Sequence, residues 1–426
     1  MQDIKLIREH PEIIKNDLKK RKDEEKIKLV DDIIEYDKKW RELTQEANKL
    51  RQDRNVITQE IAELKKKGKD VKAKMKGVKE IPNKIKKLEV QSEDYKKKIN
   101  YILMKLPNIL HESVPYGKDE NDNVVIKTWG KTPKFDFTPK THMEIMKDLG
   151  LVDAERAAKV SGAGFLYLKN KMVLLDLAIQ RFAINFLIKK GYTLIEPPFM
   201  INRKAYEGMI DFEDFEMVTY NIAGTDLYLI ATSEHPMGAM YIDEILDKKD
   251  LPIKFVGVSP CFRKEIGTHG KYTKGLFRMH QFNKVEQFIF CLPEQSWQFH
   301  EEIQNNSEQL YQQLGLHYHV VNVCTGDIGT LAAKKYDIEV WMADGQFRET
   351  GSNSNCTSYQ ARRLNIRFRE KEGQAPAGFV HTLNNTALAT SRTMMAILEQ
   401  FQQKDGSVII PKVLRPFMNG IEKLEK

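Results

Sequence analysis

Two long stretches of heptad-spaced apolar residues constrain the fold of this chain more than any other feature of its sequence. In the first stretch apolar side chains recur every three or four residues for about five repeats, at Leu29, Ile33, Tyr36, Trp40, Leu43, Ala47, Leu50, Ile57, Ile61 and Leu64. A polar break, KKKGKD, precedes the second stretch, which runs through Ile81, Ile85, Leu88, Tyr95, Ile99 and Ile102. Two long helices joined by a short break are predicted to form an antiparallel hairpin. Pro82 is expected in the first turn of the second helix, where its missing N–H is tolerated.

The predicted hairpin is strongly basic. Residues 61–100 contain 14 Lys against 6 Asp or Glu, and this excess equals the net charge of +8 of the whole chain. Such an arm is either a solvated coiled coil, a dimerisation rod, or a surface that lies along nucleic-acid phosphate. Arginine is absent from the hairpin beyond Arg54 and aromatic residues are few, so shape and phosphate contacts would dominate over base reading.

The composition excludes several classes of protein. The chain has 426 residues, enough for two or three domains, and it starts with a charged segment instead of the apolar stretch of a secretory signal. Its most apolar longer window contains Asp176 and Arg181, so no membrane span is expected. Four cysteines lie about thirty residues apart without a CxxC pair. They predict reduced thiols in a cytosolic protein and not a disulfide framework or a zinc site.

From about residue 110 the pattern changes to alternating helices and strands. Amphipathic helices are predicted at 173–190, 236–247 and 294–313, and strands at 253–263, 277–291, 318–324, 337–342 and 378–383. Because several strands follow one another without a crossover helix, we expect an α+β fold with a mostly antiparallel sheet. The sequences GxxxxGK[ST], GxGxxG, HExxH and GxSxG are absent, which disfavours the commonest nucleotide, metalloprotease and hydrolase sites.

Two adjacent segments within 258–286, VSPCFRKEIGTHGKYTKG and GLFRMHQFNKVE, nevertheless predict a nucleotide site. They read as an antiparallel pair of strands joined by a cationic loop. The pair would gather Arg263 and Glu265 from one strand with Arg278 and Phe282 from the other. Guanidinium groups suit a triphosphate, and an aromatic ring suits a purine.

These segments resemble the signature motifs of class II aminoacyl-tRNA synthetases. CFRKE…FRMHQFNKVE is similar to motif 2, GFVHTLNNTALATSRTMMAILEQFQ at 378–402 to motif 3, and GYTLIEPPFM at 191–200 to the dimer-forming motif 1. Within the class, the seryl-tRNA synthetase family is indicated by the helical hairpin, TSEHP at 232–236, FRETGSNSNCTSYQARR at 347–363 and HTLNNTALATSR. The resemblance covers essentially the whole chain, in the order that the family has.

The resemblance implies a complete functional hypothesis. Residues 1–110 would be a tRNA-binding coiled-coil arm, and 111–426 a class II catalytic domain with an antiparallel sheet flanked by helices. The protein would be a cytoplasmic homodimer without a membrane segment that uses ATP and Mg²⁺. It would convert L-serine to seryl-adenylate and then load the 3′-terminal ribose of serine tRNA; use of selenocysteine tRNA stays open.

Matching positions also imply the site residues. The ATP-binding set is Arg263, Lys264, Glu265, Arg278, Phe282, Glu349, Thr350, Gly351, Ser352 and Arg392. The serine-binding set is Thr232, Ser233, Glu234, Arg263, Glu286, Asn384 and Thr386. Arg263 and Arg392 would be the catalytic residues, and Glu349 and Ser352 would hold magnesium with ATP. His269 and Lys271 are candidates for guiding the tRNA end.

Two alternatives remain beside this hypothesis. A synthetase-like ligase could load another acceptor, but such ligases lack the RNA-gripping arm. A non-catalytic RNA-binding paralogue would usually lose the motif arginines, and Arg263 and Arg392 are both present.

Overall fold

The computed structural model describes residues 1–211, 215–265 and 275–426, which form two compact units, Met1–Pro107 and Asn108–Lys426. His269 and Lys271 therefore lie outside the described residues.

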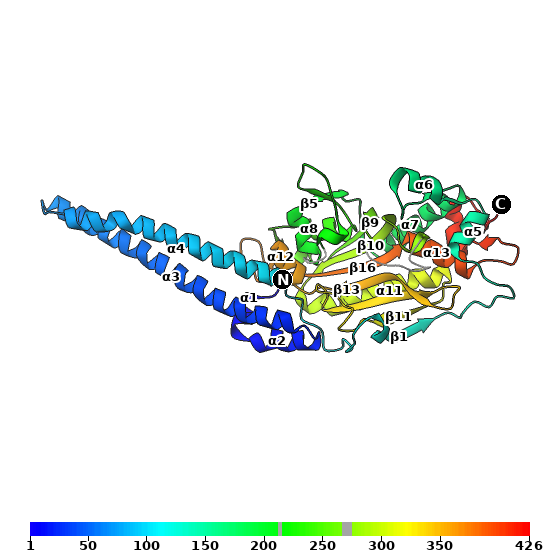
Figure 1. Ribbon diagram of the computed structural model, residues 1–426, viewed down its shortest axis with the longest axis horizontal. Helices are drawn as coiled ribbons and strands as arrows, with labels where there is room; N and C mark the ends of the chain where they lie inside the picture. The colour runs from blue at the N-terminus through cyan, green and yellow to red at the C-terminus, as the bar shows by residue number, and fades with distance from the viewer. Residues whose placement is uncertain (212–214, 266–274) are drawn as a thin grey trace. The chain divides into compact units, whose positions relative to one another are not determined.

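The first unit is a helical hairpin (Figure 1). Its helices are α1 Ile4–Glu9, α2 Pro11–Lys20, α3 Glu24–Lys66 and α4 Lys72–Lys105. The two long helices α3 and α4 pack along each other, with Ile33 and Ala47 of α3 and Ile85 and Ile99 of α4 among the buried residues. This confirms the predicted antiparallel hairpin.

The expectation for Pro82 is wrong, because Pro82 lies inside α4 and not in its first turn. The segment from Lys72 to Ile81 is rich in Lys, Ala, Met and Glu, which are good helix formers, and it extends the helix ahead of the proline. The ring deprives the helix of one internal hydrogen bond there. Pro82 is exposed, so water can solvate the carbonyl that this leaves without a partner.

The second unit is built on an eight-stranded sheet with the order β1-β11-β12-β13-β16-β10-β9-β4. The strands are β1 Val124–Trp129, β11 Tyr318–Asn322, β12 Lys334–Trp341, β13 Phe347–Asn355, β16 His381–Ala389, β10 Gln281–Cys291, β9 Ile253–Phe262 and β4 Thr193–Ile195. Every neighbouring pair is antiparallel except β4 and β9, which run parallel. The predicted α+β class with a mostly antiparallel sheet is confirmed.

Helices and smaller sheets surround this framework (Figure 1). The helices are α5 His142–Asp148, α6 Ala154–Ser161, α7 Lys171–Lys189, α8 Arg203–Met209, α9 Phe215–Val218, α10 Glu234–Gly238, α11 Ser296–Leu314, α12 Tyr359–Leu364 and α13 Thr390–Gln400. The short strands are β2 Val152–Asp153, β3 Tyr167–Leu168, β5 Met200–Asn202, β6 Tyr220–Asn221, β7 Leu227–Leu229, β8 Ile245–Asp247, β14 Arg367–Arg369, β15 Gly378–Phe379, β17 Val408–Ile409 and β18 Lys423–Leu424.

Strand β10 shows how the fold creates a site on one face of the sheet. Its odd positions, such as Val285 and Ile289, join the main core with α7, α11 and α13. Phe288 and Phe290, which point to the opposite face, join a second core with α8, α10 and α12. Toward the start of β10 the side chains on that second face line a pocket. The polar residues of β10 occupy this part of the strand.

Three predicted elements differ from the structure. The strand expected at 378–383 is divided between β15, Gly378–Phe379, and β16, His381–Ala389, which belong to different sheets. The strand expected at 277–291 begins only at Gln281, because the preceding His280 is held by tertiary contacts: its ring stacks on Phe165 with centroids 5.0 Å apart. The helix expected at 236–247 ends at Gly238, and the chain then passes through Asp243, whose φ of 63° lies in the left-handed region and is incompatible with an α-helix.

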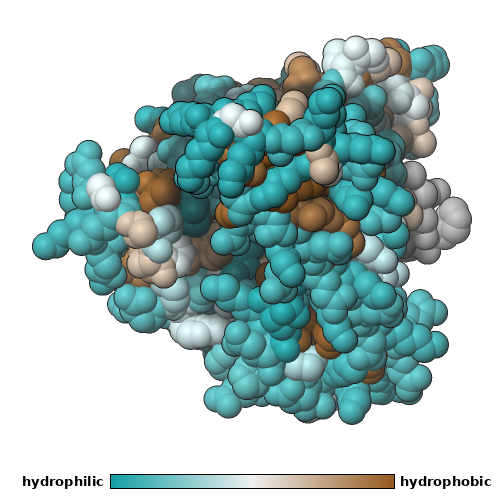
Figure 2. Space-filling model, turned by 90° about the vertical axis from the view of Figure 1, so that its left-hand side faces the viewer, coloured by the Kyte–Doolittle hydropathy of each residue, from teal (hydrophilic) through white to brown (hydrophobic). Residues whose placement is uncertain are grey.

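The surface agrees with the charged composition. On the face shown in Figure 2, hydrophilic residues cover most of the area and hydrophobic residues appear in small groups between them. Among the described helices, none has the length and apolar character needed to cross a bilayer.

Candidate active site

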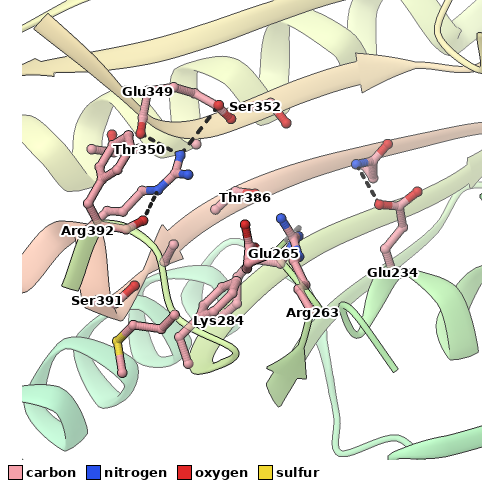
Figure 3. A pocket seen from close by; sticks show the side chains of 16 residues that line it. Glu234, Arg263, Glu265, Lys284, Glu349, Thr350, Ser352, Thr386, Ser391 and Arg392 are labelled. Atoms are coloured by element: carbon pink, nitrogen blue, oxygen red, sulfur yellow. Dashed lines mark hydrogen bonds and ion pairs between the residues drawn. The ribbon is translucent and has the colours of Figure 1, made fainter. Parts of the chain in front are cut away.

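A polar pocket opens on the sheet where β9, β10, β13 and β16 meet the start of α13. It is lined by Glu234, Arg263, Glu265, Phe277, Met279, Phe282, Lys284, Glu349, Thr350, Gly351, Ser352, Asn384, Thr386, Ala389, Ser391 and Arg392. Arg392 and Glu349 lie toward one end and Glu234 toward the other, with Arg263 and Glu265 between them (Figure 3). The structure thus brings together residues that are up to 158 positions apart in the sequence.

Arg263 occupies the middle of this pocket because β9 ends at the residue before it. Its Nε donates a hydrogen bond to the backbone oxygen of Ala231 at 3.3 Å, and its guanidinium lies 5.3 Å from the ring centroid of Phe282. Its backbone N–H donates to the oxygen of His280 at 2.9 Å. These hydrogen bonds of Arg263 go to neutral carbonyl oxygens, so its positive charge can serve an anionic ligand.

Lys284, which lines the pocket, forms an ion pair with Glu286, which is buried behind the lining. The Nζ atom of Lys284 lies 2.6 Å from Oε2 of Glu286, and the two residues are 5% and 0% exposed. The hydroxyl of Thr386 donates to Oε2 of Glu286 at 3.2 Å, and Nδ2 of Asn384 lies 3.4 Å from Oε1. Lys284 and Glu286 are two residues apart on β10 and so point to the same face, and the register with β16 places Glu286 opposite Thr386.

Glu234 forms the other acidic group at this end. Its carboxylate accepts hydrogen bonds from Nε2 of Gln360 at 3.2 Å and from Nδ2 of Asn384 at 3.1 Å. Burial and the negative charge of Glu286 raise the pKa of Glu234 to about 7, although Lys284 opposes the shift. A carboxylate that is poorly compensated in a buried site favours a cationic ligand such as an ammonium group.

At the opposite end, Arg392 is fixed by four contacts with Glu349 and Phe277. Its Nη1 donates to the backbone oxygen of Glu349 at 2.7 Å and lies 3.4 Å from the Oε2 atom of that residue. Its Nε donates to the backbone oxygen of Phe277 at 3.3 Å, and the guanidinium lies 4.6 Å from the Phe277 ring centroid. Burial opposes ionisation of Glu349, but the positive charges of Arg392 and Lys335 outweigh it and lower the pKa of this carboxyl.

The oxygen atoms at this end suit a magnesium ion that arrives with a nucleotide. The carboxylate of Glu349 and the hydroxyl of Ser352 line the same pocket, and a hard cation of this kind usually takes one or two protein oxygens together with substrate phosphates. Among residues 1–211, 215–265 and 275–426, no group of three or more His, Cys, Asp or Glu side chains could hold a metal by itself. The donor set fits magnesium bound through phosphate.

Several predicted site residues point elsewhere. The ammonium group of Lys264 donates to the backbone oxygen of Glu216 at 2.9 Å, and Arg278 lies 2.6 Å from Oε2 of Glu265 instead of lining the pocket. The expected alternation of Arg278 with Phe282 on one strand fails, since Arg278 precedes β10.

Two further predicted residues, Thr232 and Ser233, act from behind the lining. Thr232 accepts a hydrogen bond from the backbone N–H of Glu234 at 3.2 Å, and Ser233 is fully buried against β9. Thr350 lines the pocket, but its hydroxyl donates to the backbone oxygen of Ile338 at 3.2 Å. A Cβ atom added to Gly351 would lie 3.1 Å from the backbone oxygen of Thr386, so this glycine allows β13 to approach β16 closely.

Sequence reasoning missed other residues of the site. Lys284 could have been predicted, because the alternation of side chains along β10 places it on the same face as Phe282 and Glu286. Phe277, Met279 and Gln360 carried no signal, because their contacts with the site arise only from packing between distant segments.

Comparisons with known proteins agree with this geometry. The family model described as "Seryl-tRNA synthetase N-terminal domain" matches residues 1–110, and the "tRNA synthetase class II core domain (G, H, P, S and T)" matches residues 217–401. Proteins named "Serine--tRNA ligase" from Methanocella arvoryzae and Pyrococcus horikoshii are 56% and 54% identical to this chain. The alignments cover 100% of both chains in the first case, and 97% of this chain and 95% of the relative in the second.

Solved structures give the same result. The crystal structure of seryl-tRNA synthetase from Pyrococcus horikoshii complexed with ATP superimposes with a TM-score of 0.95 at 52% identity, covering 100% of this chain and 99% of the other. Cytoplasmic serine–tRNA ligase from Naegleria fowleri in complex with AMP gives a TM-score of 0.88 at 36% identity, with coverages of 99% and 98%.

Proposed function

The chain belongs to the seryl-tRNA synthetase family, and from this premise we propose how its own residues activate serine with ATP and transfer the seryl group to tRNA. The observation that carries the proposal is the position of Arg263, which lies between Glu234 at one end of the pocket and Arg392 at the other (Figure 3).

In the first step an oxygen of the serine carboxylate attacks the α-phosphorus of ATP, and pyrophosphate leaves with the bridging oxygen. The reaction needs no nucleophile from the protein, so the enzyme must align two anions and hold the charge that develops. Arg263 is the cation placed to bridge them. Its Nε already donates to the backbone oxygen of Ala231. The side chain therefore loses less conformational freedom when the substrates bind.

ATP occupies the end of the pocket that contains Phe282 and Arg392. Phe282 supplies a ring for adenine, with Glu265 reading the amino group, and Arg392 lies over the other face toward the phosphates. A contact between Arg278 and the terminal phosphates requires its ion pair with Glu265 to open. Glu349 and Ser352 would hold a magnesium ion, which would supply positive charge to the phosphates when bound.

Serine occupies the end with Glu234 and Glu286. Glu234 pairs with the ammonium group, and the acceptor atoms of Glu286, supported by Thr386 and Asn384, meet the hydroxyl. Alanine is rejected because it would leave these buried polar groups without a partner.

The basic hairpin binds the tRNA. The 14 lysines of residues 61–100 are all exposed, against 6 Asp or Glu in the same segment. Binding by phosphate contact predicts an affinity that falls steeply with salt. Serine tRNA is the proposed acceptor. Charging assays with selenocysteine tRNA in parallel would show whether that tRNA is charged as well.

A homodimer and a cytoplasmic location complete the proposal. The segment that resembles motif 1 forms β4 at the edge of the sheet. Leu194 of this strand is 42% exposed, and Leu177 and Ile188 on the neighbouring α7 are also exposed. An apolar edge of this kind favours a partner surface. All four cysteines are free and buried, which suits a reducing compartment.

The first test is ATP–pyrophosphate exchange with each of the twenty amino acids, without tRNA. Exchange with serine alone supports the proposed activation and its specificity. Exchange with another amino acid would contradict the roles of Glu286 and Thr386, and absence of exchange from a folded protein that binds tRNA would favour the non-catalytic alternative.

A further inference from the structure

Three segments that are distant in the sequence meet at His280: the loop between α6 and β3, strand β6 and the end of β9. The backbone N–H of His280 donates to the oxygen of Gly164 at 3.0 Å, and its ring stacks on Phe165 of the same loop, with an angle of 14° between the two rings. Its Nδ1 atom lies 2.7 Å from the hydroxyl oxygen of Tyr220 on β6. His280 is half-buried and belongs to no helix or strand, so these contacts fix its position.

The contact with the end of β9 is made to the main chain of Arg263 and has two parts. The N–H of Arg263 donates to the backbone oxygen of His280 at 2.9 Å, and the oxygen of Arg263 lies 2.9 Å from Nδ1 of the His280 ring. The pairing of β9 with β10 ends at Phe262 and Gln281, one residue earlier. His280 therefore holds both polar groups of the Arg263 backbone at the point where the sheet no longer does.

These partners assign the proton on the imidazole ring. A carbonyl oxygen can only accept a hydrogen bond, so Nδ1 of His280 carries the hydrogen that meets the oxygen of Arg263. The hydroxyl oxygen of Tyr220 then accepts from the same N–H group. The Nδ1–H group thus joins β6 to the end of β9.

The loop that carries Phe165 reaches the imidazole ring because residue 164 is a glycine. Gly164 has a φ of 84°, in the region that favours glycine, and a Cβ atom added to it would lie 2.3 Å from Cδ2 of His280. A side chain at this position would push the ring away from Arg263. The close approach of the loop therefore sets where the Nδ1–H group points.

We propose that His280 is a positioning residue for serine activation: its Nδ1–H group holds the carbonyl of Arg263 and so directs the guanidinium at the serine carboxylate and the α-phosphate. The inference rests on the proposed function. Without this hydrogen bond the peptide unit after Arg263 can rotate, and the side chain moves with it. Arg263 has to meet two anions in one geometry, and a small misplacement of such a group lowers the rate strongly.

Three substitutions of His280 separate the donor from the ring. His280→Asn keeps an N–H donor at the distance of Nδ1 from the backbone but removes the ring, and His280→Gln carries the same amide one bond further out. His280→Phe keeps a ring that can stack on Phe165 and has no donor. The turnover number of serine-dependent pyrophosphate exchange should stay within about fivefold of the parent in His280→Asn and fall about a hundredfold in the other two.

A split between turnover and KM identifies a positioning role. The KM for ATP should stay within about threefold of the parent in all three variants, because Phe282 and Arg392 lie on β10 and α13 and keep their places. Parent-like turnover in His280→Phe overturns the proposal. So does a hundredfold loss in His280→Asn, because the ring and not the donor would then matter.

Gly164→Ala tests the same contact from the side of the loop, and it decides the question even if His280→Phe does not fold. The new methyl group should displace the ring and lower turnover. In the double variant Gly164→Ala/His280→Asn the ring is absent, so the alanine should cost about tenfold less than it does in the parent. The strain of an alanine at this φ is common to both comparisons and cancels.

Equal losses from Gly164→Ala in both backgrounds overturn the proposal, since the methyl group would then act without the ring. If the unaltered protein shows no exchange with serine, the proposed function itself fails. That outcome is distinct, because it does not depend on any variant of His280 or Gly164.

Discussion

Removing the positive charge of Lys284 should destabilise the protein and its serine site together. Lys284 and Glu286 are 5% and 0% exposed and their charged atoms lie 2.6 Å apart. In Lys284→Met the carboxylate keeps its hydrogen bonds from Thr386 and Asn384 but loses its counter-charge. Breaking a buried ion pair by removing one partner costs about 3–5 kcal/mol, so we expect a loss of unfolding free energy of that size.

The double variant Lys284→Met/Glu286→Gln separates stability from function. Replacing both members of a buried ion pair by uncharged groups of similar volume often leaves stability nearly unchanged. The unfolding free energy of the double variant should therefore return to within about 1–2 kcal/mol of the parent. Exchange with serine should stay low, because the ionised acceptor for the serine hydroxyl is gone.

The measurements are urea unfolding and serine-dependent pyrophosphate exchange on all four members of the cycle. An additive cycle, in which the double variant is as unstable as the sum of the single ones, would refute the coupling between Lys284 and Glu286. Full exchange activity in Lys284→Met would refute the functional part of the reasoning.

Three further predictions concern the same pocket. The pKa of Glu234 is raised from its ordinary value of 4.5 to about 7, so its contribution to folding stability is complete below pH 4.5 and is lost as the pH rises through 7. The affinity for serine should conversely fall below about pH 7, where the carboxylate becomes protonated. Glu234→Gln should remove the pH dependence of stability in unfolding titrations and that of serine affinity in binding titrations. Gly351→Ala should raise the KM for serine several-fold in exchange assays, because the new methyl group would press on Thr386 at 3.1–3.4 Å; an unchanged KM would show that the strands adjust. Arg392→Lys should lower exchange by about 10²–10³-fold, since the ammonium group cannot hold the Glu349 backbone and a phosphate in one plane; near-normal turnover would exclude a role in the reaction.

The sequence alone predicted what depends on local periodicity. Heptad spacing determined the hairpin of α3 and α4, because apolar residues on one stripe of a helix must be buried against a partner. The alternation in β10 likewise identified one polar face with Phe282 and Glu286 on it, since side chains two residues apart point to the same side of a strand. The family motifs added candidate residues, most of which line one pocket.

Local patterns could not predict the start of β10 or the direction of long side chains. Arg278 and Lys264 belong to the motif, yet the first contacts Glu265 and the second reaches the backbone of Glu216. Both side chains are long and flexible, so the position of their charge depends on whichever partner the fold brings near.

Only the tertiary structure decided how the charges of the site are balanced. Glu234 receives its hydrogen bonds from Gln360 and Asn384, which lie 126 and 150 residues further along the chain. Its raised pKa depends on burial and on the nearby Glu286. The energy of a buried charge depends on all groups within a few ångströms, whatever their order in the sequence. Periodicity within a segment therefore determines which elements form and which faces they bury, whereas the chemistry of the pocket is set by packing between distant segments.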